Sequence, residues 1–164
     1  MSAAAAPLHP RAAELIVRLA LEPHVEGGRF RRLHASSQPS ALPGRPAVTS
    51  IHYLLIAGEV SRWHQVDADE IWHFLEGDPL ELLCFDAQCG RIERRRLGPA
   101  SAEQAPVVVI EAGRWQAARP LGAYALTGCT VAPGFDYGGY RLLDDAPAVA
   151  ERLRALAPDL IDLA

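Results

Sequence analysis

The sequence predicts an all-β fold, an antiparallel jelly roll with a short helix near each end. Short runs rich in β-branched and aromatic residues recur at intervals of about ten residues, which is typical of a β-sandwich or barrel. Turn residues such as those of Glu76-Gly77-Asp78-Pro79 separate the runs. No repeat of solenoid length and no low-complexity linker is present. These observations favour one compact β domain.

The first elements are a tail, a helix and a turn. Residues 1–9 are predicted to be disordered, and a single domain is expected over 10–164. Pro10 suits a first-turn position, and one apolar face over 10–21 predicts a helix there. Pro23 ends this helix because the residue before a proline avoids the helical region. Two adjacent glycines then predict a turn over 24–28.

The rest of the chain alternates strands and turns. The run 48–57 is densest in β-branched and aromatic residues and predicts a central strand. Three prolines and a glycine make 37–47 a surface loop. A closing helix is expected over 146–157, ended by Pro158. The other strands are expected at 29–36, 61–64, 70–76, 80–86, 91–97, 107–111, 115–118, 123–131 and 140–142.

Composition excludes several classes of function. A chain of 164 residues buries about 70% of its surface and has a real core. A net charge of −4 argues against a nucleic-acid partner held by bulk charge. The chain has no lysine, which excludes a P-loop lysine and a lysine Schiff base.

Location is expected to be cytoplasmic, with no membrane partner. The three cysteines are too few and too scattered for a disulfide framework and are interpreted as reduced thiols. The first residues lack the basic and apolar regions of a signal peptide. No run approaches the roughly 18 apolar residues of a membrane span.

Two separate stretches carry the candidate chemistry. In the first, His64 and Glu70 lie six residues apart between Gly58 and Gly77, flanked by strand-forming residues. The second, 106–116, is a buried-looking strand, a glycine turn and a polar residue entering the next strand.

These stretches resemble the two motifs of the cupin superfamily. The glycines, His64 and Glu70 fall at the spacings of the first motif, but Val66 replaces its second histidine. Gln116 stands where the second motif has a histidine. Further matches at 23–30, 69–74, 115–120 and 131–136 are similar to the cupin-5 family of unknown function, over roughly residues 8–143. The resemblance implies a double-stranded β-helix barrel with a ligand cavity.

Strand alternation predicts which side chains enter that cavity. Alternate residues of a strand share a face, so the expected small-molecule pocket is an apolar bowl with three polar groups. Its expected lining is His64, Val66, Glu70, Trp72, Phe74 and Gln116. Phe135, which follows the Pro133-Gly134 turn, is expected to cap the mouth by family comparison. His52 is either a core histidine or a pocket residue.

The family comparison also places His64, Glu70 and Gln116 at metal-ligand positions. One imidazole, one carboxylate and one amide make a poor cage for iron, manganese or zinc. We therefore expect no cofactor, and any divalent metal should be weakly bound.

Without a metal, Glu70 could orient His64 and raise its pKa, which makes an imidazole base. Metal-independent sugar epimerases with this barrel pair a histidine base with a tyrosine acid, which makes Tyr53, Tyr124 and Tyr137 candidate acids. The alternative is that His64 and Glu70 only fix the pocket by hydrogen bonding.

Three functions remain in order of preference. The first is an isomerase or epimerase of a sugar-like or small polar metabolite, with His64 as base. The second is a non-catalytic small-molecule binder or sensor. The third is a metal-dependent dioxygenase, disfavoured by Val66 and Gln116. A homodimer is expected because the two-sided hydrophobicity of 51–56 leaves apolar surface to be covered.

Overall fold

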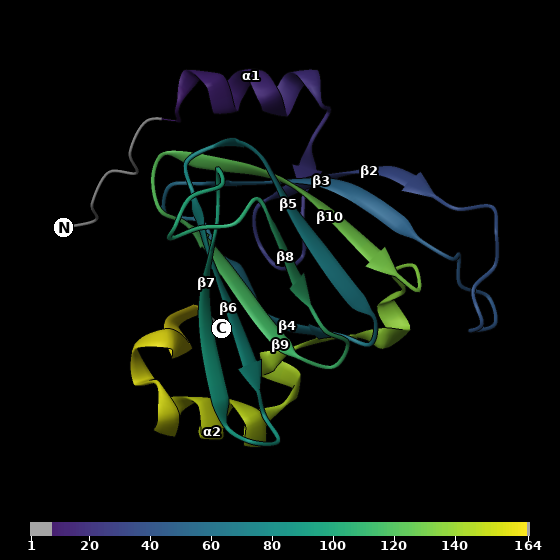
Figure 1. Cartoon of the computed structure of the whole chain (residues 1–164), viewed down its shortest axis with the longest axis vertical. Helices are drawn as coiled ribbons and strands as arrows, with labels where there is room; N and C mark the ends of the chain where they lie inside the picture. The colour runs from purple at the N-terminus through teal and green to yellow at the C-terminus, as the bar shows by residue number, and fades with distance from the viewer. Residues whose placement is uncertain (1–7, 164) are drawn as a thin grey trace.

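Two antiparallel sheets packed face to face make up the molecule, and two helices flank them (Figure 1). The computed structural model describes residues 8–163, so most of the predicted disordered tail lies outside the described residues. One sheet has the strand order β1-β2-β3-β10-β5-β8 and the other β11-β4-β9-β6-β7. This arrangement confirms the predicted all-β jelly roll.

The observed elements match the predicted strands to within two residues at each end. An extra two-residue strand and three short 3₁₀ helices were not predicted. Within residues 8–163, no helix has the length and apolar character that a bilayer crossing demands. The bounds are α1 (Pro10–Arg18), β1 (Glu22–Pro23), β2 (Arg29–Ala35), β3 (Thr49–Ile56), β4 (Ser61–Val66), β5 (Asp69–Gly77), β6 (Leu80–Asp86), β7 (Arg91–Leu97), β8 (Val107–Ile110), β9 (Trp115–Pro120), β10 (Tyr124–Ala132), η1 (Tyr137–Gly139), β11 (Tyr140–Leu142), η2 (Leu143–Asp145), α2 (Pro147–Leu156) and η3 (Pro158–Leu163).

Helix α1 covers the outer face of the six-stranded sheet. It ends at Arg18 rather than at Leu21 because Ala20 adopts a left-handed conformation, with φ of 49°, which stops the helix. Its apolar side packs against Leu54 and Leu126. The apolar outer residues of β3 are therefore covered within the chain. The homodimer stays a prediction. The apolar surface on β3 that motivated it is covered by α1.

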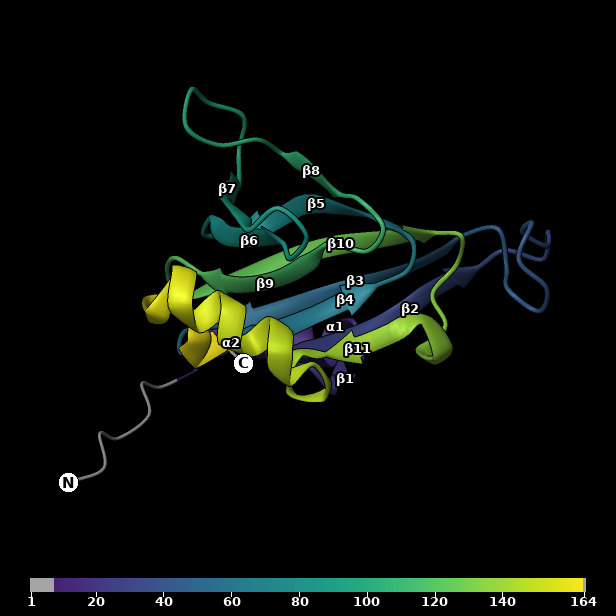
Figure 2. The ribbon, with the colours of Figure 1, turned by 90° about the horizontal axis from the view of Figure 1, so that it is seen from below.

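Helix α2 and η3 cover the outer face of the five-stranded sheet, on the side of the molecule away from α1 (Figures 1 and 2). Two large buried side chains of that face, Trp63 and Trp115, pack against Leu153 and Leu160. Trp63 also donates its indole N–H to the carbonyl of Leu160 at 2.9 Å. Both outer faces thus have a helical cover.

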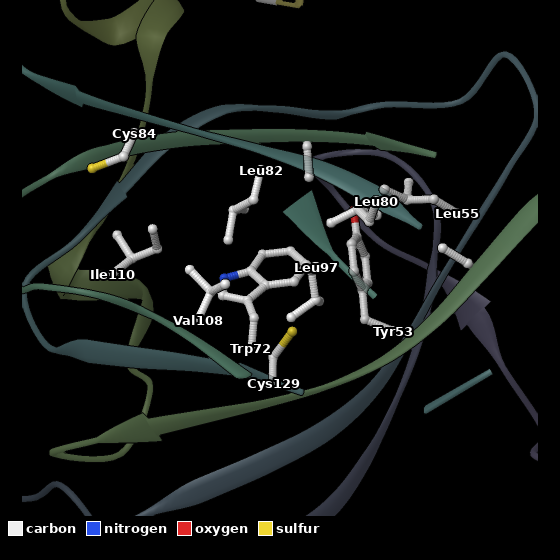
Figure 3. Packing of buried hydrophobic residues seen from close by; sticks show 12 residues of the cluster. Tyr53, Leu55, Trp72, Leu80, Leu82, Cys84, Leu97, Val108, Ile110 and Cys129 are labelled. Carbon is white, nitrogen blue, oxygen red and sulfur yellow. The ribbon is translucent and has the colours of Figure 1, made fainter. Parts of the chain in front are cut away.

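The space between the sheets is filled by apolar side chains over part of its length only. Trp72 lies at the centre of this packed part, beside Cys129 and Leu97 (Figure 3). Tyr53 from β3 and Leu82 from β6 close over it from either sheet. The cluster occupies the interior near β6, β7 and β8, and the cavity described below occupies the other part.

The loop between β2 and β3 is tied to the turn that follows β10. The Arg45 guanidinium donates to the carbonyl of Gly134 and to both carboxylate oxygens of Asp67, each at 2.8 Å. Thr49 accepts the backbone N–H of Phe135 on its hydroxyl oxygen at 2.9 Å. These bonds fix the position of Phe135 at one end of the interior.

The two glycines of the first motif provide a matched test of this packing. Gly77 has a φ of 102°, and a methyl group there would collide with the carbonyl oxygen and ring of Tyr124. Gly58 also has positive φ, at 83°, but nothing lies within 4 Å of the added methyl. Gly58→Ala is expected to lower the free energy of unfolding by about 1 kcal/mol through backbone strain, and Gly77→Ala by about 3 kcal/mol or more. Urea unfolding measures both, and equal losses would contradict the expected clash.

Candidate functional site

A cavity of about 490 Å³ lies between the sheets beyond the packed cluster. This volume is typical of small-molecule sites. Its apolar wall comes from Phe30, Ile51, Val66, Val131 and Phe135. Its polar lining includes His24, Glu26, His64, Glu70 and Tyr140. A bowl of this kind recognises a ligand that presents polar groups on a short carbon frame.

His64 projects from β4 into the cavity floor and is 2% exposed. Its Nδ1 lies 2.7 Å from the carbonyl oxygen of Arg62, which can only accept, so Nδ1 carries the proton. The free lone pair is then on Nε2, which lies 3.4 Å from Oε2 of Glu26. Burial lowers the pKa of His64, although the charge of Glu70 acts in the opposite direction. The imidazole is therefore neutral at pH 7, with a basic nitrogen at the floor.

Glu26 is the centre of the polar cluster and is 7% exposed. The Ser61 hydroxyl donates to its Oε1 at 3.0 Å, and the Tyr140 hydroxyl donates to its Oε2 at 3.4 Å. His24 Nδ1 lies 3.7 Å from the same Oε2. Burial raises the pKa of Glu26, against the opposing effect of His24. The carboxyl group therefore retains its proton more readily than usual and can share it with His64 Nε2.

Glu70 enters the cavity from β5 and is fixed from behind. Gln116 Nε2 donates to Glu70 Oε2 at 2.6 Å, and Gln116 Oε1 accepts from the indole N–H of Trp72 at 2.9 Å. Because an indole N–H only donates, this contact determines which way the amide faces. Burial raises the pKa of Glu70 to about 7, even though His64 and Gln116 act to lower it. The Glu70 carboxyl group can therefore gain or lose a proton near neutral pH.

The structure changes the predicted relation between His64 and Glu70. Within the described residues, no hydrogen bond joins them, and the group that orients His64 is the Arg62 carbonyl. Glu26 is the carboxyl nearest to Nε2. The predicted role of Glu70 in orienting the imidazole is wrong, because Glu70 is held by the amide of Gln116.

Alternation gives the correct face for Trp72, Phe74 and Gln116, but these side chains do not line the cavity. Trp72 and Phe74 belong to the packed cluster, and Gln116 lies behind Glu70. His52 is also absent from the lining. Its neighbours Ile51 and Tyr53 face the interior, so His52 lies on the opposite face of β3. His64, Val66, Glu70 and Phe135 do line the cavity.

Sequence reasoning missed His24, Glu26 and Tyr140. His24 was expected only as part of the turn over 24–28, yet its ring packs edge-on against Phe30 and lines the cavity. The alternation of His24 and Glu26 before two glycines was a usable signal. The signal for Tyr140 was only its place in a predicted strand, because its pairing with Val66 of β4 is a long-range contact.

Tyr140 stacks on His64, with ring centroids 5.7 Å apart and planes inclined by 28°. Burial raises the pKa of Tyr140, so its hydroxyl stays protonated and can donate a hydrogen bond. Of the predicted acids, Tyr137 lines the cavity. The Tyr53 hydroxyl donates to the Gly27 carbonyl and the Tyr124 hydroxyl to Glu76, so neither faces the cavity.

The donor set does not fit a metal. Gln116 directs its amide N–H at Glu70 and uses its oxygen on Trp72, so it offers no ligand atom beside His64 and Glu70. In the part of the chain that the structure describes, no three His, Cys, Asp or Glu side chains are placed to hold one ion. The predicted set of His64, Glu70 and Gln116 therefore lacks a third strong ligand.

The facing sheets and the cavity between them are those of a cupin-fold protein. The family model described as the cupin superfamily (DUF985), Cupin_5, matches residues 13–143. The chain belongs to this family. No functionally curated protein matches the sequence.

Several solved structures are similar over most of the chain. The crystal structure of protein SO0799 from Shewanella oneidensis shares 31% identity with a TM-score of 0.81, over 91% of this chain and 96% of that one. A hypothetical protein from Leishmania major shares 25% identity with a TM-score of 0.76, over 93% and 95%. Oxalate decarboxylase from Bacillus subtilis shares 18% identity with a TM-score of 0.60, over 81% of this chain and 33% of that one. This last likeness shows the fold alone.

The raised pKa of Glu70 makes a prediction about stability. The folded value of about 7 exceeds the ordinary value of 4.5, so the folded state binds a proton more tightly. The contribution of Glu70 to the free energy of unfolding therefore falls as pH rises from 4.5 to about 7 and stays low above that pH. Glu70→Gln removes this dependence. The free energy of unfolding of the variant, relative to that of the wild type, should therefore rise by up to roughly 3 kcal/mol between pH 5 and pH 8.

Urea unfolding of both proteins at the two pH values measures the gain. Glu76→Gln is the control, since Arg11 holds the pKa of Glu76 at about 2 and leaves this carboxylate ionised at both pH values. The difference between Glu76→Gln and the wild type should therefore not change with pH. A Glu70→Gln difference that is equally flat would contradict the assigned pKa.

Proposed function

We propose that the protein binds a small polar metabolite in this cavity and catalyses an isomerisation or epimerisation by proton transfer, without a metal. The observation that carries the proposal is that two proton-transfer groups enter the cavity from facing sheets, His64 from β4 and Glu70 from β5. His64 offers a neutral Nε2, and Glu70 has a pKa of about 7. General acid–base catalysis is most effective when such pKa values lie near the working pH.

In the proposed reaction, His64 Nε2 removes the proton from a carbon next to a carbonyl group. The electron pair of the C–H bond then moves toward the carbonyl oxygen. The Tyr140 hydroxyl, which donates to Glu26 Oε2 in the free protein, turns to donate its hydrogen bond to that oxygen. Protonated Glu70 returns a proton to the same carbon, which gives the epimer. For isomerisation, the hydroxyl proton of the substrate first moves to the former carbonyl oxygen, and Glu70 then protonates the adjacent carbon while the second oxygen becomes the new carbonyl. His64 leaves the cycle as imidazolium and Glu70 as carboxylate, and exchange with water restores both.

Glu26 is proposed as a positioning residue for this step. Its Oε2 lies 3.4 Å from His64 Nε2, close enough to stabilise the imidazolium as it forms. The Arg62 carbonyl holds the opposite nitrogen and fixes the tautomer. The stacked ring of Tyr140 restricts the imidazole plane. Together these contacts leave His64 one orientation, which a base requires.

Exchange of carbon-bound protons tests the proposal directly. The protein is incubated in D₂O with a panel of hydroxyaldehydes, hydroxyketones and hydroxyacids. Deuterium should be incorporated next to the carbonyl, and proton NMR measures the rate of this exchange. His64→Gln should lower this rate at least about 100-fold, because it removes the base. His52→Gln, on the outer face of β3, is the matched control and should keep the rate. A chelator should leave the rate unchanged.

A binder without catalysis would give a different result. Ligand binding with no exchange in the wild type would identify a binding or sensor protein and overturn the proposed reaction. A rate lost on chelation would overturn its metal independence. A melting temperature for His64→Gln close to that of the wild type confirms that the loss is chemical.

The pH profile of kcat/KM follows from the two pKa values. Activity should fall as pH rises above about 7, because Glu70 then loses the proton that it must donate. Activity should fall on the acid side only below the ordinary histidine pKa of 6.5, because burial lowers the pKa of His64. Steady-state rates across pH 4 to 10 measure this bell-shaped profile. Activity that rises continuously to high pH would contradict Glu70 as the acid.

A further inference from the structure

The mouth of the cavity carries two arginines that the proposed reaction does not use. Arg31 and Arg32 both lie on β2, and both line the cavity while their side chains are exposed, which places them at its open end. Arg31 forms an ion pair with Glu22 at 3.1 Å. No side-chain carboxylate within residues 8–163 pairs with Arg32. Arg32 is therefore a guanidinium available at the entrance.

The register of β2 explains why Arg32 faces the cavity. Arg32 pairs with Ile51 of β3, and Phe30 pairs with Tyr53. Directly opposed residues of an antiparallel pair point to the same side, so Arg32 shares the inner face with Phe30 and Ile51. Both neighbours line the cavity. A strand position on an otherwise apolar inner face thus holds a charged side chain.

The floor and the mouth differ in charge. Glu26 and Glu70 are buried at the floor, so a ligand anion placed there would be poorly solvated and would be repelled by the charged forms of both carboxyl groups. A guanidinium at the mouth offers a fork of N–H donors that matches a carboxylate or a phosphate. The wall between them is apolar, with Phe30, Ile51 and Val131.

We propose that the ligand is a small anionic metabolite whose carboxylate or phosphate group is bound by Arg32 at the mouth. Its uncharged hydroxyl or carbonyl end reaches His64 and Glu70 at the floor. The orientation of this inner end rests on the proposed function, whereas binding of the anionic end by Arg32 does not. Arg32 thereby determines specificity, and Arg31 is less available because of its pair with Glu22.

Ligand-observed NMR with matched compounds tests this assignment. The probes are small hydroxycarboxylic acids with their primary amides, and sugar phosphates with the parent sugars. The affinity of each probe is measured by titration with the wild type, with Arg32→Gln and with Arg96→Gln. The last variant removes an equal charge from β7, where Arg96 pairs with Glu103 outside the cavity.

The acids or the phosphates should bind more tightly than their neutral partners, at least tenfold. Arg32→Gln should weaken the charged probes at least tenfold and leave the neutral ones unchanged, and Arg96→Gln should behave as the wild type. Whether the carboxylate or the phosphate set binds identifies the anionic group. Equal affinity of charged and neutral probes, charged probes insensitive to Arg32→Gln, or no binding of either charged set at millimolar concentration would overturn the proposal.

These outcomes are separable from those of the proposed reaction. Anions that bind through Arg32 with no deuterium exchange would sustain this assignment and reject the isomerase. Deuterium exchange on neutral substrates that is insensitive to Arg32→Gln would support the proposed reaction and reject the proposed role of Arg32.

Discussion

The burial of two carboxyl groups beside an imidazole is the constraint on which the rest of the site depends. Glu26 and Glu70 are each 7% exposed, so water stabilises their charged forms poorly. Their polar partners must come from the protein, and Ser61 and Gln116 supply hydrogen bonds. Trp72 is part of the same arrangement because its indole N–H fixes the Gln116 amide. Trp72, a residue of the packed interior, thus fixes the amide that donates a hydrogen bond to the cavity carboxyl group of Glu70.

The division of the interior into a packed part and an open part makes this burial possible. Large side chains around Trp72 fill the space between the sheets toward β6 and β7 (Figure 3). At the other end, the segment after β10 folds back and is held through Arg45 to Asp67. β11 then pairs with β4 and brings Tyr140 over His64. The cavity wall is therefore built from segments far apart in the sequence.

The family relationship defines the fold, and the chemistry depends on individual residues. In this chain Val66 cannot bind a metal, and Gln116 is committed to Trp72 and Glu70. What remains is a set of proton donors and acceptors with pKa values moved by burial. The proposed reaction and the proposed anion at Arg32 use opposite ends of the same cavity, and each depends on a different charge.

The sequence by itself determined the strands, the inward faces of β4, β5 and β9, and the presence of His64 and Glu70 in one pocket. The strands and their inward faces follow from local propensity and from the two-residue alternation of a strand. The shared pocket of His64 and Glu70 follows from the resemblance of their motif to that of the cupin family. Only the tertiary structure decided that Gln116 lies behind Glu70, that Arg62 orients His64, and that Glu26 is central. Inward orientation does not distinguish a packed side chain from one facing a cavity. That distinction depends on which distant strand lies opposite, and pKa values depend on the burial that results.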